Sequence, residues 1–108
     1  MAVDPHLVEQ LRDVLGDHPG LSEKKMFGGI CFMLNGNMLC ATRVGRFMFR
    51  VGKEREAEAL DMPGAEPMQH GARRMPGFIW VDAGEAIETG LDRWTSLALR
   101  YVGGMPPK

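Results

Sequence analysis

Hydrophobic residues near the start of the chain recur at helical spacing. Asp4 is a favourable N-cap, and Pro5 suits a first helical turn because an amide hydrogen there would have no partner. Gly16 and the turn-forming residues 17–20 end the pattern, so we expect one helix between these two signals. Its apolar face, spaced by three and four positions, comprises Leu7, Val8, Leu11, Val14 and Leu15.

Residues 26–51 change to the alternating period that is typical of strands. The pair Asn35-Gly36 predicts a two-residue type I′ hairpin turn, because both residues accept the positive φ that this turn requires. Gly28 and Gly29 predict a bulge or a close approach of another backbone segment. We therefore expect a three-stranded antiparallel meander. Its strands cover residues 29–34, 37–44 and, after a break at Gly45, 47–51.

The second half of the chain predicts two more helices and at least one strand. Residues 53–60 are rich in Glu and Ala and favour a short helix, whereas Phe78 to Val81 read as a buried strand. Residues 65–77 are irregular by composition, with room for a short edge strand near Met68. Thr89, with Asp92 three residues later, predicts the N-cap of a last helix. The apolar face of this helix comprises Leu91, Trp94, Leu97, Ala98, Tyr101 and Val102.

These elements predict one small α+β domain. Strands grouped between helices indicate a two-layer architecture, an antiparallel sheet with helices, in the order α-β(3)-α-β(2)-α. We expect the domain to cover residues 1–104 and residues 105–108 to form a C-terminal tail.

Composition and charge place the chain among ordinary globular proteins and reveal a charge pattern along it. Its 108 residues are 44% hydrophobic and 25% charged, which excludes a disordered protein. The longest apolar run has five residues, far from the roughly 20 that cross a bilayer, and no signal peptide is evident. We expect a cytoplasmic protein without membrane contact. Residues 24–55 carry a net charge of +6 between acidic flanks, which indicates complementary faces of one domain or a surface for a partner.

The two cysteines offer a redox hypothesis and a simpler alternative. With Asn35-Gly36 as the turn, Cys31 is predicted to face Cys40 in a non-hydrogen-bonded pair, with Cα atoms about 4.5 Å apart. Such a pair could form a strained, reducible bridge. The alternative, which the cytoplasmic setting favours, is two reduced thiols packed beside Met33.

No pattern in the sequence predicts a catalytic, cofactor or metal site. His6, His18 and His70 are scattered, and neither Cys-x-x-Cys nor His-x-x-x-His occurs. A nucleophilic pair of Cys31 or Cys40 with His70 would need an exposed thiol, whereas both cysteines lie in apolar strands. We expect no cofactor and no metal, and an enzyme remains the less favoured class.

Basic residues define a candidate surface for a partner or an anion. Alternation places Phe47 and Phe49 toward the core and the neighbouring arginines toward solvent. Nucleic acid is a conceivable partner, but a pI near 6.3 lies well below the value above about 9 that is typical of such domains. The candidate residues are Arg43, Arg46, Arg50, Arg73 and Arg74.

Several short motifs resemble the TfoX N-terminal domain family, and more narrowly the stand-alone members of the TfoX/Sxy group. They are KKMFGG at residues 24–29, Phe32, NGNM at 35–38 and RVG at 50–52, with weaker matches through Trp94 to the final Pro-Pro-Lys. The resemblance spans nearly the whole chain. It implies an α-β(3)-α-β(2)-α fold and no established catalytic residues. Long members are competence regulators with an additional C-terminal helical domain, which we expect this chain to lack.

The resulting hypothesis is a non-enzymatic regulatory or adaptor domain that acts through protein contacts. A direct nucleic-acid-binding regulator is the alternative, followed by a thiol-dependent enzyme or redox switch using Cys31 and Cys40. The first predicted hairpin is apolar on both faces and helices cover only one, so the second face needs another cover. Either a second copy of the chain covers it, in a homodimer through the sheet, or the segment 65–77 covers it within one chain. In this prediction Phe32 lies in the dimer interface.

Overall fold

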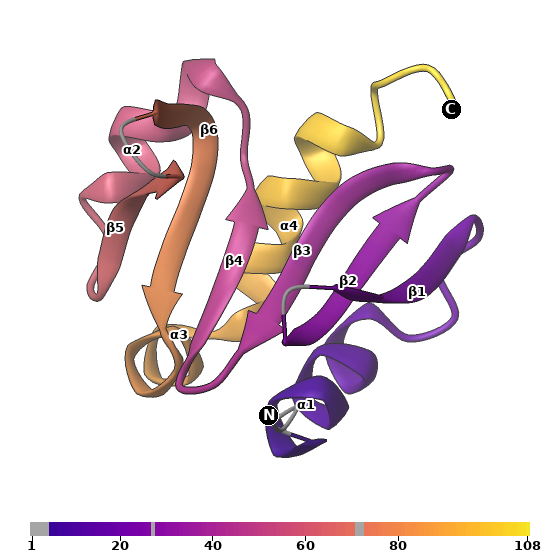
Figure 1. Ribbon diagram of the computed structural model, residues 1–108, viewed down its shortest axis with the longest axis horizontal. Coiled ribbons are helices and arrows are strands. Elements are labelled where there is room, and N and C mark those ends of the chain that lie inside the picture. Colours follow the sequence, from indigo (N-terminus) through magenta and orange to yellow (C-terminus); the bar gives the residue numbers. More distant parts are fainter. Residues whose placement is uncertain (1–4, 27, 71–72) are drawn as a thin grey trace.

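The computed structural model describes residues 5–26, 28–70 and 73–108 and consists of a six-stranded antiparallel sheet and helices (Figure 1). The strand order is β1-β2-β3-β4-β6-β5. This architecture confirms the predicted α+β class; the predicted N-cap Asp4 lies outside the described residues. The elements are α1 (Pro5–Leu15), β1 (Leu21–Met26), β2 (Gly29–Leu34), β3 (Asn37–Arg43), β4 (Arg46–Arg50), η1 (Lys53–Arg55), α2 (Glu56–Leu60), β5 (Ala65–His70), β6 (Arg73–Asp82), α3 (Ala83–Thr89) and α4 (Leu91–Val102).

The hydrophobic core lies between one face of the sheet and the helices. Helix α4 lies behind β3 and β4 in Figure 1, and α1 and α3 pack against α4. Phe49 of β4 stacks on Trp94 of α4 with ring centroids 5.2 Å apart, and both side chains are fully buried. Burying a phenylalanine side chain contributes about 2–3 kcal/mol, so this contact fixes the helical layer on the sheet.

Two elements were not predicted, and the start of the last helix differs. Strand β1 pairs with β2 along its whole length. Helix α3 is capped by Asp82, whose carboxylate accepts a hydrogen bond from the Glu85 amide at 3.1 Å. The predicted N-cap Thr89 is wrong: it is the last residue of α3, and Gly90 precedes α4 with φ 115°. The expected short edge strand is β5, and β6 extends well before Phe78.

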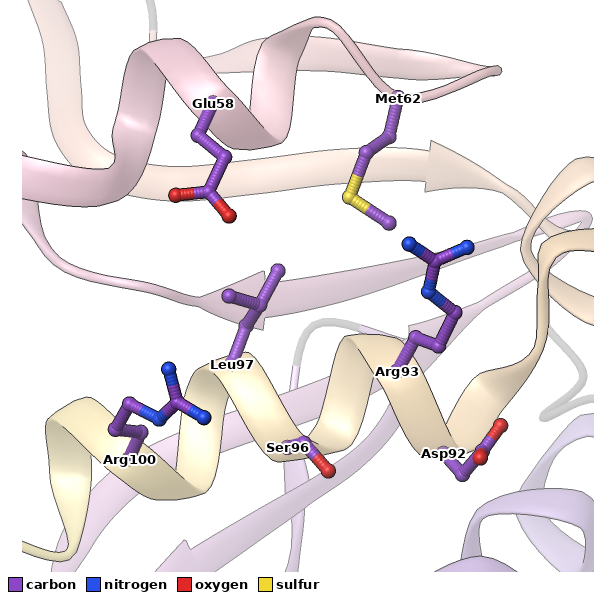
Figure 2. A pocket seen from close by; sticks show the side chains of 7 residues that line it. All are labelled: Glu58, Met62, Asp92, Arg93, Ser96, Leu97 and Arg100. Carbon is purple, nitrogen blue, oxygen red and sulfur yellow. The ribbon is translucent and has the colours of Figure 1, made fainter.

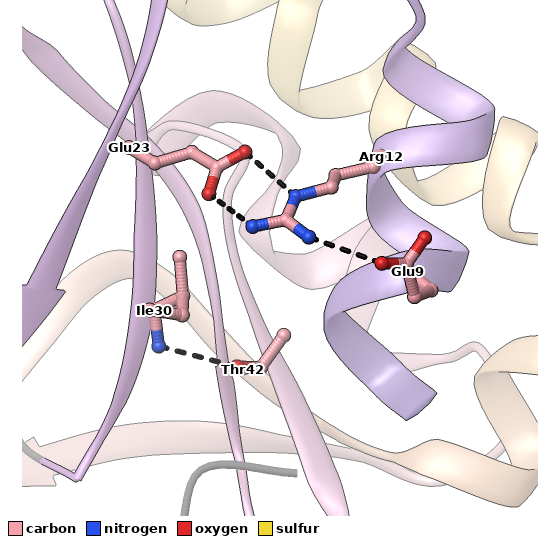
Figure 3. Close-up of polar contacts among 5 residues, drawn as sticks. All are labelled: Glu9, Arg12, Glu23, Ile30 and Thr42. Atoms are coloured by element: carbon pink, nitrogen blue, oxygen red, sulfur yellow. Dashed lines mark hydrogen bonds and ion pairs between the residues drawn. The ribbon is translucent and has the colours of Figure 1, made fainter. Parts of the chain in front are cut away.

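Two local predictions in the first hairpin are confirmed. Asn35 and Gly36 have φ values of 52° and 84°, as the type I′ turn requires. At Gly29 the backbone of β3 lies so close that a Cβ atom would sit 2.8 Å from the Thr42 carbonyl carbon. The Thr42 hydroxyl also accepts a hydrogen bond from the Ile30 amide at 3.3 Å (Figure 3).

A bulge between β2 and β3 corrects the predicted register. Met33 faces Met38 as expected, but Phe32 then faces Cys40, and Leu39 is the extra residue. The predicted pairing of Cys31 with Cys40 is therefore wrong, because Cys31 faces Ala41 instead. Beyond the bulge, Leu39 and Cys40 both belong to the core beneath the helices, whereas Cys31 does not.

Polar contacts hold the first helix and the last residues against the sheet. Arg12 of α1 donates hydrogen bonds to both carboxylate oxygens of Glu23 in β1, at 2.8 and 2.9 Å, and one to Glu9 at 3.1 Å (Figure 3). The Asn37 side chain donates to the Pro106 carbonyl at 2.9 Å, so residues 105–108 lie against the first hairpin. No helix among the described residues is long and apolar enough to cross a membrane.

Candidate functional site

The face of the sheet that is turned away from the helices is the candidate site, and we call it the open face. Directly opposed residues of antiparallel strands point to the same side, so the register identifies its members. One row crosses all six strands and comprises Lys24, Cys31, Ala41, Met48, Trp80 and Glu66. Two shorter rows flank it. One comprises Met33, Met38, Arg50 and Phe78, and the other comprises Arg43, Arg46 and Asp82.

The centre of the open face is apolar although no described helix packs on it. Cys31 and Met48 are each 2% exposed and Trp80 is 9% exposed, yet none of them belongs to the core cluster that the helices complete. Side chains of the same face lie beside them: the Met33 sulfur is 4.0 Å from the Cys31 sulfur, and Arg46 lies over Trp80. Met33 and Met38 are themselves half-buried. A water-facing antiparallel sheet normally presents polar residues there, so the apolar composition of this face is unusual.

Two arginines gather over Trp80 at one end of the open face. The Arg46 guanidinium carbon lies 4.0 Å from the Trp80 ring centroid, and that of Arg43 lies 5.7 Å from it. Both distances allow cation–π attraction. Beside them a hollow of about 130 Å³ is lined by Trp80, Arg46, Glu66, Asp82, Gly64, Val44 and Gly45.

Arg50 marks the other end of the face. Its guanidinium carbon lies 5.1 Å from the Phe78 ring centroid and 5.8 Å from that of Tyr101 on α4. It also donates a hydrogen bond to the Met38 carbonyl at 3.4 Å. The guanidinium is thus held at the border between the open face and the end of α4.

The five arginines named from the sequence do not form one patch. Arg43, Arg46 and Arg50 share the open face, whereas Arg73 and Arg74 lie at the distant start of β6. Arg74 is paired with Glu56 at 2.8 Å, and Arg73 is exposed. The structure therefore brings three of the five together.

The two cysteines are free thiols on different sides of the sheet. Burial raises the pKa of the Cys31 thiol, with Lys24 acting in the opposite direction, and burial raises the pKa of the fully buried Cys40 still further. The Cys31 sulfur lies 3.9 Å from the Phe32 carbonyl oxygen and 4.0 Å from the Met33 sulfur. A nucleophilic thiol needs a lowered pKa, so neither environment activates its cysteine.

A second hollow lies on the helical side, between α2 and α4 (Figure 2). It measures about 330 Å³, and its lining residues are Glu58, Met62, Asp92, Arg93, Ser96, Leu97 and Arg100. This lining contains no cysteine and no histidine, and its acidic and basic side chains balance. Its chemistry therefore matches none of the nucleophilic sites considered from the sequence.

Residues with metal-binding side chains do not converge in the described part of the chain. No group of three or more His, Cys, Asp or Glu side chains is arranged there to hold an ion. His6 lies on α1, His18 in the turn that follows, and His70 at the end of β5.

Sequence reasoning missed several members of the open face. Lys24 belongs to the unpredicted strand β1, while Phe78 and Trp80 were assigned to a buried strand without a side. Alternation within Phe78-Ile79-Trp80-Val81 does separate two aromatic from two aliphatic residues. The face that each pair takes is decided by pairing with β4, about 30 positions earlier in the chain.

Comparison with known proteins gives a family for the chain. No curated protein and no solved structure matches it. The model of the TfoX N-terminal domain matches residues 13–101, which include every strand and most of the helical layer. The motifs around Gly29 and the Asn35-Gly36 turn fall inside this range. The chain therefore belongs to the TfoX N-terminal domain family.

Proposed function

We propose that this competence-regulator-like domain is a non-enzymatic adaptor whose open face binds a partner protein. The observation that carries the proposal is the apolar floor of Cys31, Met48 and Trp80, which lies outside the core cluster and on which no described helix packs. Methionine side chains are flexible and polarisable, and they suit surfaces that repack around a partner. Arginine and aromatic residues are likewise enriched where proteins meet.

The rival thiol enzyme has little physical support. Both thiol pKa values are raised by burial, and the two cysteines face different neighbours across the strands. A redox bridge between Cys31 and Cys40 rested on a register that β2 and β3 do not adopt. The adaptor proposal needs neither thiol to react.

Nucleic-acid binding remains the second candidate because four basic residues share the open face. They are Lys24, Arg43, Arg46 and Arg50. However, the guanidinium groups of the three arginines already lie over the rings of Trp80 and Phe78. A pI near 6.3 also weighs against this candidate, because domains that bind nucleic acid typically have a pI above about 9.

Site-specific photo-crosslinking in the native cytosol tests the adaptor proposal. A photoreactive residue at position 38, on the open face, is expected to give discrete adducts with another protein. The same residue at position 96, on the exposed side of α4, serves as the matched control and is expected to give few. Equal adducts from both positions, or none from position 38, would contradict the proposal.

The dimer interface expected from the sequence cannot be the one that includes Phe32. Phe32 is fully buried under the helices, so it does not lie in any interface of the folded chain. A sheet-mediated dimer would have to use Met33, Met38 and Met48 instead. Sedimentation of the isolated chain at micromolar concentration distinguishes a 12.0 kDa species from a dimer.

A further inference from the structure

Resting on the proposed adaptor function, we infer that the partner segment is an acidic amphipathic helix. Its apolar stripe would lie on Met33, Met38 and Met48, and its carboxylates would meet Arg46 and Arg50 at the two ends of the open face.

The occupant of a sheet face has to satisfy its own backbone hydrogen bonds. The amide and carbonyl groups of the four inner strands, β2, β3, β4 and β6, are used within the sheet, and side chains of the open face offer few replacements. An extended peptide lying on this face would lose hydrogen bonds to water without regaining them. A helix keeps its backbone bonds internal and presents an apolar stripe, so it is the form of chain that suits this surface.

The charge of the open face selects an acidic partner. Four basic residues surround the apolar floor, and Glu66 and Asp82 are the acidic members, both toward the β5–β6 side. Asp82 is already engaged as the N-cap of α3. Arg46 and Arg50 are four residues apart on one strand, which corresponds to about 13 Å. Two helical turns rise about 11 Å, so acidic residues about seven positions apart would reach both arginines.

An anchor position lies at the Arg46 end of the face. The hollow of about 130 Å³ beside Trp80 is lined by Arg46, Glu66 and Asp82 and by the backbone at Gly45 and Gly64, so charged groups of both signs border it and an uncharged side chain suits it. Interfaces draw much of their binding energy from single apolar or aromatic side chains that fill such depressions. We expect the helix to place one Leu, Met or Phe there.

A second copy of this chain is a poorer occupant than an acidic helix. A copy stacked on the open face would set two surfaces of the same sign against each other, because four basic and only two acidic residues lie on each. Like charges that face each other in an interface oppose association. Self-association is therefore kept as an outcome of the test.

Selection from a display library tests the chemistry of the partner directly. The bait is the full chain, and the library consists of helix-forming peptides of 18 residues with randomised surface positions. Binding sites are mapped by the methionine methyl signals: Met33, Met38 and Met48 report on the open face, and Met62 on the helical side. We expect enriched peptides to combine an apolar stripe with Asp and Glu and to shift the first three signals.

Variants and salt separate this inference from its alternatives. We expect Arg46→Gln and Arg50→Gln each to weaken the selected peptides about tenfold, and the control Arg100→Gln on α4 to change affinity less than twofold. Affinity should also fall as NaCl rises from about 50 to 500 mM.

Several results would overturn the inference, and they differ in whether the adaptor function survives. Open-face binders without acidic residues would refute the acidic helix while leaving the adaptor function intact. Binders that shift only Met62, or a failure to select any binder, would count against both. Tight binding of a 20-base-pair duplex, abolished by Arg46→Gln, would assign the face to nucleic acid. A dimer whose dissociation on dilution shifts the signals of Met33, Met38 and Met48 would assign the face to a second copy.

Discussion

Replacing Gly29 by alanine adds one methyl group where two strands come closest. The new Cβ would lie 2.8 Å from the Thr42 carbonyl carbon and within van der Waals overlap of the carbonyl oxygen. Gly29 does not have a positive φ, so alanine meets no conformational penalty there. The whole effect is therefore steric, and it falls on backbone that the sheet holds in place.

The magnitude follows from overpacking and from one lost hydrogen bond. Extra atoms in a well-packed site cost about 1–3 kcal/mol, and separating β2 from β3 would also weaken the Ile30–Thr42 bond, worth about 1 kcal/mol. We expect Gly29→Ala to lower the free energy of unfolding by about 2–4 kcal/mol. For a domain of this size that corresponds to a fall in Tm of about 10–20 °C.

Thermal unfolding followed by circular dichroism measures this effect, and the neighbouring glycine supplies the control. Gly28 has φ +77° with open space around it. In Gly28→Ala the left-handed conformation alone should lower the free energy of unfolding, by about 1–2 kcal/mol. The reasoning is refuted when Gly29→Ala melts at the wild-type temperature, or when Gly28→Ala proves the more damaging of the two.

Three further perturbations test the packing and the polar contacts. The indole nitrogen of buried Trp94 has no hydrogen-bond partner among the described residues, so Trp94→Phe should cost less than about 2 kcal/mol in urea unfolding, against about 3–5 for Trp94→Ala. Asn37→Ala removes the donor to Pro106 and should cost about 1–2 kcal/mol, with faster amide exchange at Lys108, whose amide donates to the Asn35 carbonyl. Hydrogen bonds from Arg12 lower the pKa of Glu23 in the folded chain. The stability that Glu23 contributes is therefore complete above its unfolded pKa near 4.3 and is lost as the pH falls through the lower folded value. When the free energy of unfolding is measured against pH, we expect it to depend on pH less steeply in Glu23→Gln than in the wild type.

Local rules explain which parts of the fold could be predicted. The Asn35-Gly36 turn and the close approach at Gly29 depend on residues whose backbone preferences dominate their surroundings. The helices α1 and α4 carry a strong apolar face and a clear end signal. Each of these features is decided within a few positions of the chain.

The elements that were missed depend on tertiary contacts. Strand β1 reads Leu-Ser-Glu-Lys-Lys-Met and has mostly exposed side chains, so no alternation marks it; pairing with β2 makes it a strand. Charged residues such as Lys24 and Lys25 are usual at a sheet edge, where they discourage pairing with other chains. Thr89 was a plausible N-cap for the last helix, but the chain turns at Gly90, so Thr89 is the last residue of α3.

Part of the candidate site was accessible from alternation and part was not. Alternation placed Arg46, Met48 and Arg50 on one face of β4, as observed. Trp80 lies beside them only because β6 pairs with β4, which precedes it by about 30 residues. Cation–π contacts with Arg46 could therefore not be predicted from either strand alone.

The bulge at Leu39 decides which methionines lie on the open face. An unbroken hairpin would place Met33 and Met38 on the same side as Phe47 and Phe49, under the helices. One extra residue reverses this relation, because it turns Leu39 and Cys40 together toward the core and leaves Met33 and Met38 beside Met48. Bulges re-aim side chains next to functional sites in many sheets. In this domain the irregularity between β2 and β3 separates the two cysteines and brings Met33 and Met38 to the proposed interaction surface, so this surface depends on that break in register.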